Sequence, residues 1–528
     1  MPADGEPDLP TSSTTRDREL HIEQHVMAAS RATGGSAGDP RHRPVSLLLA
    51  AVAGTVGSLC VLLGSSQGAS PFALKAAGAW YFGTASPAPG STTARFLGIM
   101  LVYAGMALML GAWFEIVRSL RSRPGGGALP VSAVLVSWAA PVLVAPPLFS
   151  RDIYAYVGQG ALVDRGINPY AHGTAALGSD PLARLVDPLW QHATTPYGPA
   201  WLRLSGWVVH VAGHDLLAAV VGFRLVAAVG VAVLGWGVAA LARTIGRDPG
   251  TALAVGVLNP LVLLVLLGGA HNDALMLGLL VGACALARRH HYVAGLVLCS
   301  FAGQVKAPAL IGAVFIGWWW AGDRAGTRQR LAGIAGAAVL SWLLMAVIGA
   351  ASSLGWGWIG SLVTGSTVVS WLDPATAVGL AIAHAASAAG LGGHHLGIVR
   401  AVRAVALGSA ALVTLHLLFR NRRIGAVDAL GWSLLAFVVL GPVIWPWYET
   451  WPLVVLGIVA EGRTLRLVLI LSAVACFADV PHPGFLVAGD PVVVGVAWAA
   501  FAASVALFVA TRVVPRRTRR ARLAVPSG

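Results

Sequence analysis

Long apolar stretches alternate with short polar connections along most of the chain, starting near residue 45. Many stretches approach about 20 residues, the length that a helix needs to cross about 30 Å of hydrocarbon. They lack the two-residue alternation of an outer-membrane barrel, and helices are the remaining way to satisfy backbone polar groups in lipid. The pattern therefore predicts an all-α protein, a polytopic bundle of transmembrane helices with outward-facing interfacial loops.

About fourteen spans are predicted, and two of them share one apolar run. The run 292–320 is too long for one upright helix, and Gln304, Lys306 and Pro308 interrupt its middle. Both flanks are rich in arginine, so we expect a hairpin of two short helices whose turn presents Lys306 outward. The other spans are expected near residues 45–65, 95–117, 130–149, 216–242, 250–269, 273–287, 331–350, 396–419, 426–442, 450–461, 466–480 and 491–513.

Composition supports a bilayer as the solvent, since 56% of the residues are hydrophobic and 11% are charged. Soluble domains carry roughly 25% charged residues. The formal charge of +14 lies in short arginine clusters between apolar runs and at the C-terminus, which indicates membrane topology and argues against nucleic acid as a partner. With these clusters inside, the positive-inside rule places both termini in the cytoplasm and the loop 150–215 outside. We expect a plasma (cytoplasmic) membrane protein whose active site faces the extracytoplasmic side.

The chain is predicted to have three regions. Residues 1–42 are polar and too poor in large apolar side chains to order themselves, so they form a disordered cytoplasmic tail. Residues 43–514 form the transmembrane domain, whose first run starts too late for a cleaved signal and acts as an uncleaved anchor. Residues 515–528 form a basic cytoplasmic tail. The four cysteines lack metal-ligand spacing and are interpreted as small hydrophobic residues.

A carboxylate stands directly after the third predicted span, at Asp152 in the sequence Arg151-Asp152-Ile153-Tyr154. A lipid-linked substrate presents its phosphate and sugar at this depth of the membrane. Transfer of such a sugar needs a base that takes the proton from the attacking hydroxyl. One carboxylate suffices for inversion, because a phosphate leaving group needs little help from an acid. Asp152 is the candidate base, and the alternative is that it caps an amphipathic interfacial helix over residues 153–165.

Two further polar groups are expected at the outer surface. His271, Asn272 and Asp273 lie in the turn between two spans, where they would either hydrogen-bond sugar hydroxyls or cap a helix. Lys306 is one of two lysines in the chain and breaks an apolar run. An ionisable group at such depth is a functional candidate by default, and a lysine that snorkels to the interface is the alternative.

Arg400 and Arg403 lie three residues apart at the expected outer end of a span. This spacing on one helix face suits the gripping of phosphate oxygens, and their position breaks the positive-inside pattern. We therefore favour phosphate binding over simple anchoring. No second carboxylate of the DxD type stands near Asp152, so neither a metal nor another cofactor is predicted. Several aromatic residues of the remaining outer loops stay unassigned between sugar stacking and an aromatic belt: Trp356, Trp358, Trp371, Trp445, Trp447, Tyr448 and Trp451.

Five short motifs follow one another along the chain: Ser150–Tyr156 (SRDIYAY), Gly166–Tyr170 (GINPY), Thr195–Pro199 (TPYGP), Gly269–Leu275 (GAHNDAL) and Lys306–Leu310 (KAPAL). In this order they resemble the actinobacterial polyprenol-phosphate-mannose-dependent α-1,6-mannosyltransferases, which are membrane glycosyltransferases of the GT-C type. The resemblance covers most of the membrane region. In that family an acidic residue of an early external loop is the expected base, and this role falls on Asp152.

The resemblance implies an inverting transfer of mannose from a polyprenyl phosphate donor to a lipid-linked α-1,6-mannan acceptor, in the synthesis of lipomannan-type cell-envelope glycans. Arg151, Tyr154 and Tyr197 join the substrate-binding candidates, and membrane lipid surrounds the enzyme. A GT-C transferase for another polyprenyl-phosphate sugar is the first alternative. A transporter or flippase of lipid-linked saccharides is the second, but it would place charges near the membrane midplane and show repeated broken spans in two halves.

Overall fold

The computed structural model describes residues 47–67, 70, 79–81, 84–86, 92–122, 127–362, 368–369, 373–390 and 395–478. Most of these residues are helical, which confirms the all-α prediction. One short antiparallel pair of strands is added by β1 (Ala79–Tyr81) and β2 (Thr84–Ser86). The predicted tails at 1–42 and 515–528, the predicted span at 491–513 and Trp371 lie outside the described residues.

Within the described ranges, five helices contain segments long and apolar enough to cross a membrane. They are α2 (Leu47–Ser65), α3 (Thr92–Ser122), α8 (Leu216–Thr244), α13 (Thr327–Ser352) and α16 (His395–Ile424). A bent pair of helices raises the number to six. The expected fourteen spans are therefore not confirmed as a count, because many of the remaining apolar helices are short. These shorter helices include α4 (Ala128–Val144), α15 (Pro374–Ala388), α17 (Ala426–Val439), α18 (Pro446–Val459) and α19 (Gly462–Ala478).

The hairpin predicted for residues 292–320 is confirmed. Helix α11 (Tyr292–Val305) ends at Lys306, whose backbone is extended, and the chain continues through the 3₁₀ turn η3 (Ala307–Leu310) into α12 (Ile311–Trp320). The rings of Tyr292 and Trp320 stack with their centroids 5.8 Å apart, so the two ends of the run return to the same place. Pro308 lies in the first turn of η3, where a backbone N–H would make no hydrogen bond within the helix, so proline is tolerated there.

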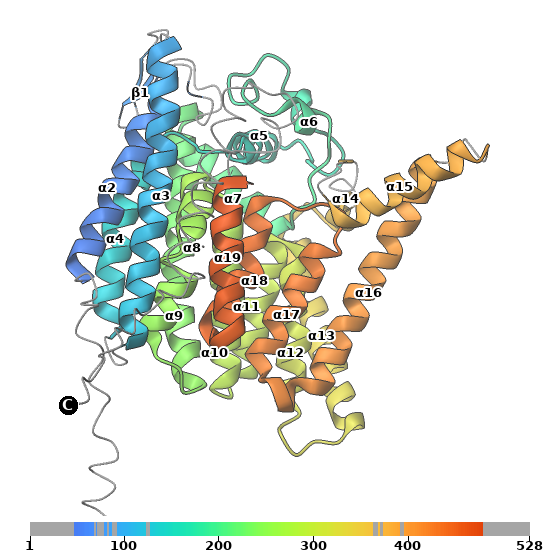
Figure 1. The fold of residues 1–528 in the computed structure, drawn as a ribbon. Coiled ribbons are helices and arrows are strands. Elements are labelled where there is room, and N and C mark those ends of the chain that lie inside the picture. The colour runs from blue at the N-terminus through green and yellow to red at the C-terminus, as the bar shows by residue number, and fades with distance from the viewer. Residues whose placement is uncertain are drawn as a thin grey trace, which may run out of the picture. The chain divides into compact units, whose positions relative to one another are not determined.

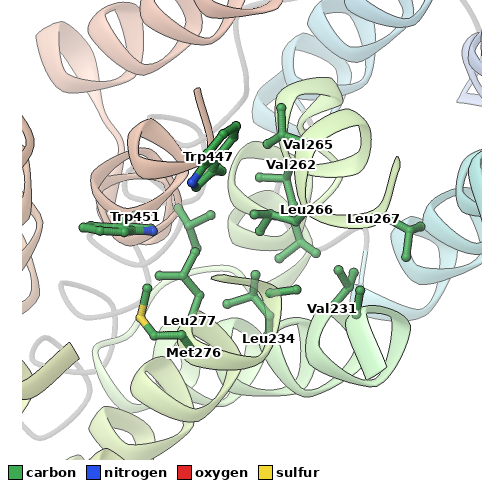
Figure 2. Packing of buried hydrophobic residues seen from close by; sticks show 14 of the residues in the cluster. Val231, Leu234, Val262, Val265, Leu266, Leu267, Met276, Leu277, Trp447 and Trp451 are labelled. Atoms are coloured by element: carbon green, nitrogen blue, oxygen red, sulfur yellow. The ribbon is translucent and has the colours of Figure 1, made fainter. Parts of the chain in front are cut away.

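The bent pair consists of the π-helix η2 (Val262–Gly268), which follows α9 (Pro249–Gly256), and α10 (Asp273–Arg288). The two axes meet at 116° across the motif that contains His271. The bend packs closely on α8, because a Cβ added at Gly230 would lie 2.5 Å from the backbone nitrogen of Leu275. Figure 2 shows buried residues of α8, η2 and α10 packed beside Trp447 and Trp451 of α18.

The long connection after α4 folds into α5 (Asp152–Asp164), η1 (Thr174–Leu177), α6 (Pro188–Gln191) and α7 (Pro199–Val211). In Figure 1, α5 and α6 lie near the top of the view, above the upper ends of α18 and α19. The predicted helix at 153–165 is confirmed, but its predicted amphipathic character is wrong. Every residue from Ile153 to Val163 is buried, because η1, α7 and α8 cover the helix from several sides.

Candidate active site

Asp152 is the first residue of α5 and does not occupy its N-cap position. The N-cap is Arg151, which makes no side-chain capping hydrogen bond, whereas the backbone N–H of Asp152 donates to Ser150 Oγ at 3.1 Å. The side chain of Asp152 is 15% exposed, and its Oδ2 lies 3.6 Å from Nδ1 of His271. The Asp152 carboxylate is therefore available for chemistry beside an imidazole, and the simple capping alternative is not needed to explain its position.

His271 lies in the bend between η2 and α10 and is almost fully buried. Its ring stacks on Trp447 at a centroid distance of 3.9 Å, and Trp447 stacks on Trp445 at 5.2 Å. A Cβ added at Gly269 would lie 2.7 Å from the His271 ring. The imidazole is thus held between the backbone of its own turn and an aromatic stack on α18, which fixes its orientation toward Asp152.

Lys306 forms a buried ion pair with Asp273. The Lys306 Nζ donates to both carboxylate oxygens of Asp273, at 3.0 and 2.8 Å, and Trp451 Nε1 donates to Asp273 Oδ1 at 2.7 Å. The side chain of Asp273 is fully buried and that of Lys306 is 8% exposed. A snorkelling lysine would reach toward water, so this geometry favours a site residue. Three rings surround the ammonium group within cation–π range: Tyr448 at 4.6 Å, Trp451 at 5.6 Å and Tyr197 at 5.9 Å.

Asn272 and Tyr197, two further predicted site residues, join this cluster through amide and aromatic contacts. The hydroxyl of Tyr156 donates to Asn272 Oδ1 at 3.3 Å, and the Tyr156 ring packs edge-on against Tyr197. A Cβ added at Gly198 would come within 2.4 Å of the Gln304 carbonyl oxygen, so the turn after Tyr197 docks directly on the hairpin. The amide nitrogens Nδ2 of Asn272 and Nε2 of Gln304 are buried and have no hydrogen-bond partner among the described residues.

The charges around Asp152 tune its acidity. Burial raises the pKa of Asp152 to about 7, the nearby Lys306 opposes this rise, and the negative charges of Asp273 and Asp187 add to it. The hydrogen bond with Ser150 lowers the pKa. A general base works best when its pKa lies near the operating pH, so this carboxylate is suited to accept a proton from a hydroxyl.

Arg151 and Tyr154 lie at the edge of the cluster. Arg151 Nη1 is 3.7 Å from Asp187 Oδ2, which connects the start of α5 with the N-cap of α6. Tyr154 is buried in α5.

Sequence reasoning missed Arg224 of α8, whose Nη1 donates to the carbonyls of Val142 at 2.7 Å and Leu143 at 3.1 Å. The position of this charged residue inside the span predicted at 216–242 was the sequence feature that could have pointed to it.

Arg400 and Arg403 do not join the cluster of charges that act on Asp152. Arg403 Nε donates to Thr376 Oγ1 at 2.9 Å, and Nη2 donates to the Val368 carbonyl at 2.5 Å. Asp373 lies nearby, and its Oδ1 accepts a hydrogen bond from the Ile444 backbone at 2.7 Å. Arg400 is exposed. Arg403 therefore holds the segment before α15, and phosphate binding by this pair stays a prediction.

The aromatic residues of α18 are a further group that sequence reasoning left unassigned. Trp447 supports His271, Tyr448 covers Lys306, and Trp451 donates to Asp273. Their spacing in the chain did not distinguish them from a membrane belt. In the described part of the chain, no three side chains of His, Cys, Asp or Glu come together as metal ligands. The independence from metal and cofactor stays a prediction.

Comparison with known proteins provides evidence that does not depend on the geometry of the site. A family model described as alpha-(1→6)-mannopyranosyltransferase, N-terminal domain, matches residues 51–322, and a model of the MptB C-terminal domain matches residues 375–511. The chain is 35% identical over 378 residues to alpha-(1→6)-mannopyranosyltransferase A of Mycobacterium tuberculosis, covering 70% of this chain and 72% of that protein. It is 31% identical over 407 residues to alpha-(1→6)-mannopyranosyltransferase B of Corynebacterium glutamicum, covering 71% and 68%. No solved structure matches significantly.

Proposed function

We propose that this chain, which belongs to the alpha-(1→6)-mannopyranosyltransferase family, transfers mannose with inversion from polyprenyl phosphate mannose to a lipid-linked α-1,6-mannan acceptor of lipomannan-type glycans. It is a multi-pass membrane glycosyltransferase. The observation that carries the proposal is the carboxylate of Asp152, which lies 3.6 Å from a buried imidazole and has no cation paired directly with it among the residues that the structure describes, whereas the nearby Asp273 is held by Lys306. One base and one cation are what a direct displacement at a sugar phosphate needs.

In the proposed reaction, the Asp152 carboxylate takes the proton from the acceptor hydroxyl as its oxygen attacks C1 of mannose. The bond from C1 to the phosphate oxygen breaks, and its electron pair leaves with the polyprenyl phosphate. Attack opposite the phosphate inverts the anomeric centre, so a β-linked donor gives an α-linked product. His271 positions Asp152 from a distance of 3.6 Å, since its own ring is held by Trp447.

Lys306 is proposed to contact the leaving phosphate. An ammonium group has three donors, and two of those of Lys306 are directed to Asp273. One N–H therefore remains for a phosphate oxygen, at a side chain that is 8% exposed. Asp273 then acts as a positioning residue that holds the lysine side chain, rather than as a ligand of sugar hydroxyls.

We place this site at the extracytoplasmic face of the plasma membrane. The site gathers the first residues of α5, α10 and α18 with the end of α11. The opposite ends of α10 and α12 lead into the arginine-rich connections at Arg288–Arg289 and Arg324. Arginine clusters favour the cytoplasmic side, which supports an outward-facing site. A polyprenyl phosphate presents its sugar at the membrane surface, within reach of such a site.

Transfer by the purified protein tests the proposal. Given radiolabelled polyprenyl phosphate mannose and a short α-1,6-mannoside, the protein is expected to extend the mannoside. Parallel reactions contain polyprenyl phosphate donors of other sugars, including arabinose, and a reaction without acceptor measures hydrolysis. Transfer of another sugar alone would refute the mannose donor while leaving the glycosyltransferase class intact.

The pH dependence of transfer should report Asp152. Its carboxylate must be deprotonated to accept a proton, and its pKa is raised to about 7. We expect kcat/KM for the acceptor to rise about tenfold per pH unit below pH 7 and to level off above it. Initial rates measured from about pH 5 to 9 in one detergent, with protein integrity checked at each pH, provide the profile. A profile that is flat between pH 5 and 8 would contradict Asp152 as the base.

A further inference from the structure

A cavity of about 300 Å³ lies in the connection between α5 and α7, apart from the cluster around Asp152. Its walls come from η1 and from the segment that leads into α6. This volume is at the lower end of the range for sites that hold small molecules, roughly 300 to 1,000 Å³. The polar residues of its lining are Thr174, Ser179, Asp180, Arg184 and Gln191.

The polar groups of this cavity form a mixed set of donors and acceptors. Asp180 is already engaged, since it pairs with Arg165 and accepts from the Leu182 N–H at 2.8 Å. Arg184 is exposed and forms no ion pair within the described ranges. Gln191 uses its amide nitrogen toward the Val186 carbonyl at 3.1 Å, which leaves its oxygen as an acceptor.

A ligand that carries several hydroxyl groups matches this set best. A hydroxyl both donates and accepts, so it can satisfy both the guanidinium of Arg184 and the oxygen of Gln191. A phosphate has no donor for the Gln191 oxygen, whereas a sugar hydroxyl can donate to that oxygen and accept from Arg184. The chemistry therefore favours a neutral sugar unit over an anionic group.

The cavity is tied to the candidate base through α5. Gly158 packs directly on the cavity wall, because an added Cβ would lie 2.8 Å from Thr174 Cγ2 and 3.2 Å from Val186 Cγ2. Gly158 follows Asp152 by six residues, which is about 9 Å along a helix that rises 1.5 Å per residue. The ion pair of Arg151 with Asp187 connects the start of α5 with the other end of the same wall. The axial part of this separation is within the length of a short saccharide.

We propose that this cavity binds an internal sugar unit of the acceptor mannan, behind the terminal unit whose hydroxyl reacts at Asp152. The inference rests on the proposed mannosyl transfer and adds a second subsite to it. A subsite at this position makes the enzyme prefer acceptors long enough to reach it. The shortest acceptors engage only the site at Asp152.

The test compares acceptors of increasing length in two cavity variants of the full-length protein. Arg184→Ala removes a donor, and Ala175→Trp fills the cavity from an exposed position in its lining. His192→Ala is the control, because His192 is exposed, follows Gln191 and does not line the cavity. KM is measured for a monomannoside and for α-1,6-linked mannosides of two to six units, at a saturating concentration of polyprenyl phosphate mannose.

The wild-type KM is expected to fall with acceptor length, and each cavity variant should raise the KM of long acceptors by about tenfold. The KM of the monomannoside and of the donor should not change, and His192→Ala should match the wild type. A wild-type KM independent of length, or variants that raise the KM of all acceptors equally, would overturn the subsite. Absence of any mannosyl transfer by the wild type would instead refute the proposed function.

Discussion

Asp152→Asn is expected to lower turnover by roughly 10² to 10⁴ while donor binding changes little. Asparagine keeps the size of the side chain and most of its hydrogen bonding, but it cannot accept the proton of the acceptor hydroxyl. The base lies outside the ion pair of Lys306 with Asp273, so the substitution leaves that pair in place. Single-turnover rates and donor titrations with the purified variant separate the two effects.

The matched control for this substitution is Asp164→Asn, at the opposite end of the same helix. Asp164 contacts the exposed His210 and His214, far along α5 from the candidate site. Asp164→Asn should retain near-native turnover at comparable expression. If Asp152→Asn also retained near-native turnover, Asp152 would not be the base. Asp273 would then be a weak replacement, because Lys306 and Trp451 already occupy its oxygens.

Lys306→Met is expected to destabilise the protein and to weaken donor binding together. It leaves the fully buried Asp273 without its cation, and breaking a buried ion pair in this way costs about 3 to 5 kcal/mol. Loss of a charge-assisted hydrogen bond to the donor phosphate adds about 1.5 to 3 kcal/mol to the free energy of donor binding. Thermal unfolding in detergent and a donor titration measure the two losses independently.

The double variant Asp273→Asn/Lys306→Met distinguishes the two roles of the lysine. Removing both charges removes the unpaired carboxylate, so the unfolding temperature should recover much of its loss. Donor binding should stay weak, because the phosphate still lacks its cation. Arg289→Met, which removes an exposed charge at the far end of α10, is the control. Recovery of donor binding together with stability would show that Lys306 has a structural role alone.

Local pattern was sufficient to predict the parts of the fold that depend on neighbouring residues. The break at Lys306 was predicted because a charged residue and Pro308 interrupt an apolar run, and the hairpin follows from the length of that run. The helix after Asp152 was predicted from its composition. Its burial was not, because the segments that cover it come from later parts of the loop and from α8.

The partners of the site residues could not be predicted, because they depend on contacts between distant parts of the chain. Asp273 and Lys306 are 33 residues apart, and Trp451 is 178 residues from Asp273. The spacing of Arg400 and Arg403 on one helix face was a valid local observation. That spacing could not reveal the partners of Arg403, which makes its hydrogen bonds with Thr376 and the Val368 carbonyl. Helical spacing shows which side chains lie together, but not which distant segment packs against them.

The anomeric configuration of the newly formed bond tests most directly the proposed mechanism, a single direct displacement at C1 of the donor. A β-linked polyprenyl phosphate mannose labelled with ¹³C at C1 is incubated with the wild-type protein and an α-1,6-mannoside, and the coupling constant at the labelled carbon is measured by NMR. Direct displacement from a β-linked donor predicts a product that is entirely α-linked. A β-linked product would contradict it, because retention requires a second displacement through a glycosyl intermediate.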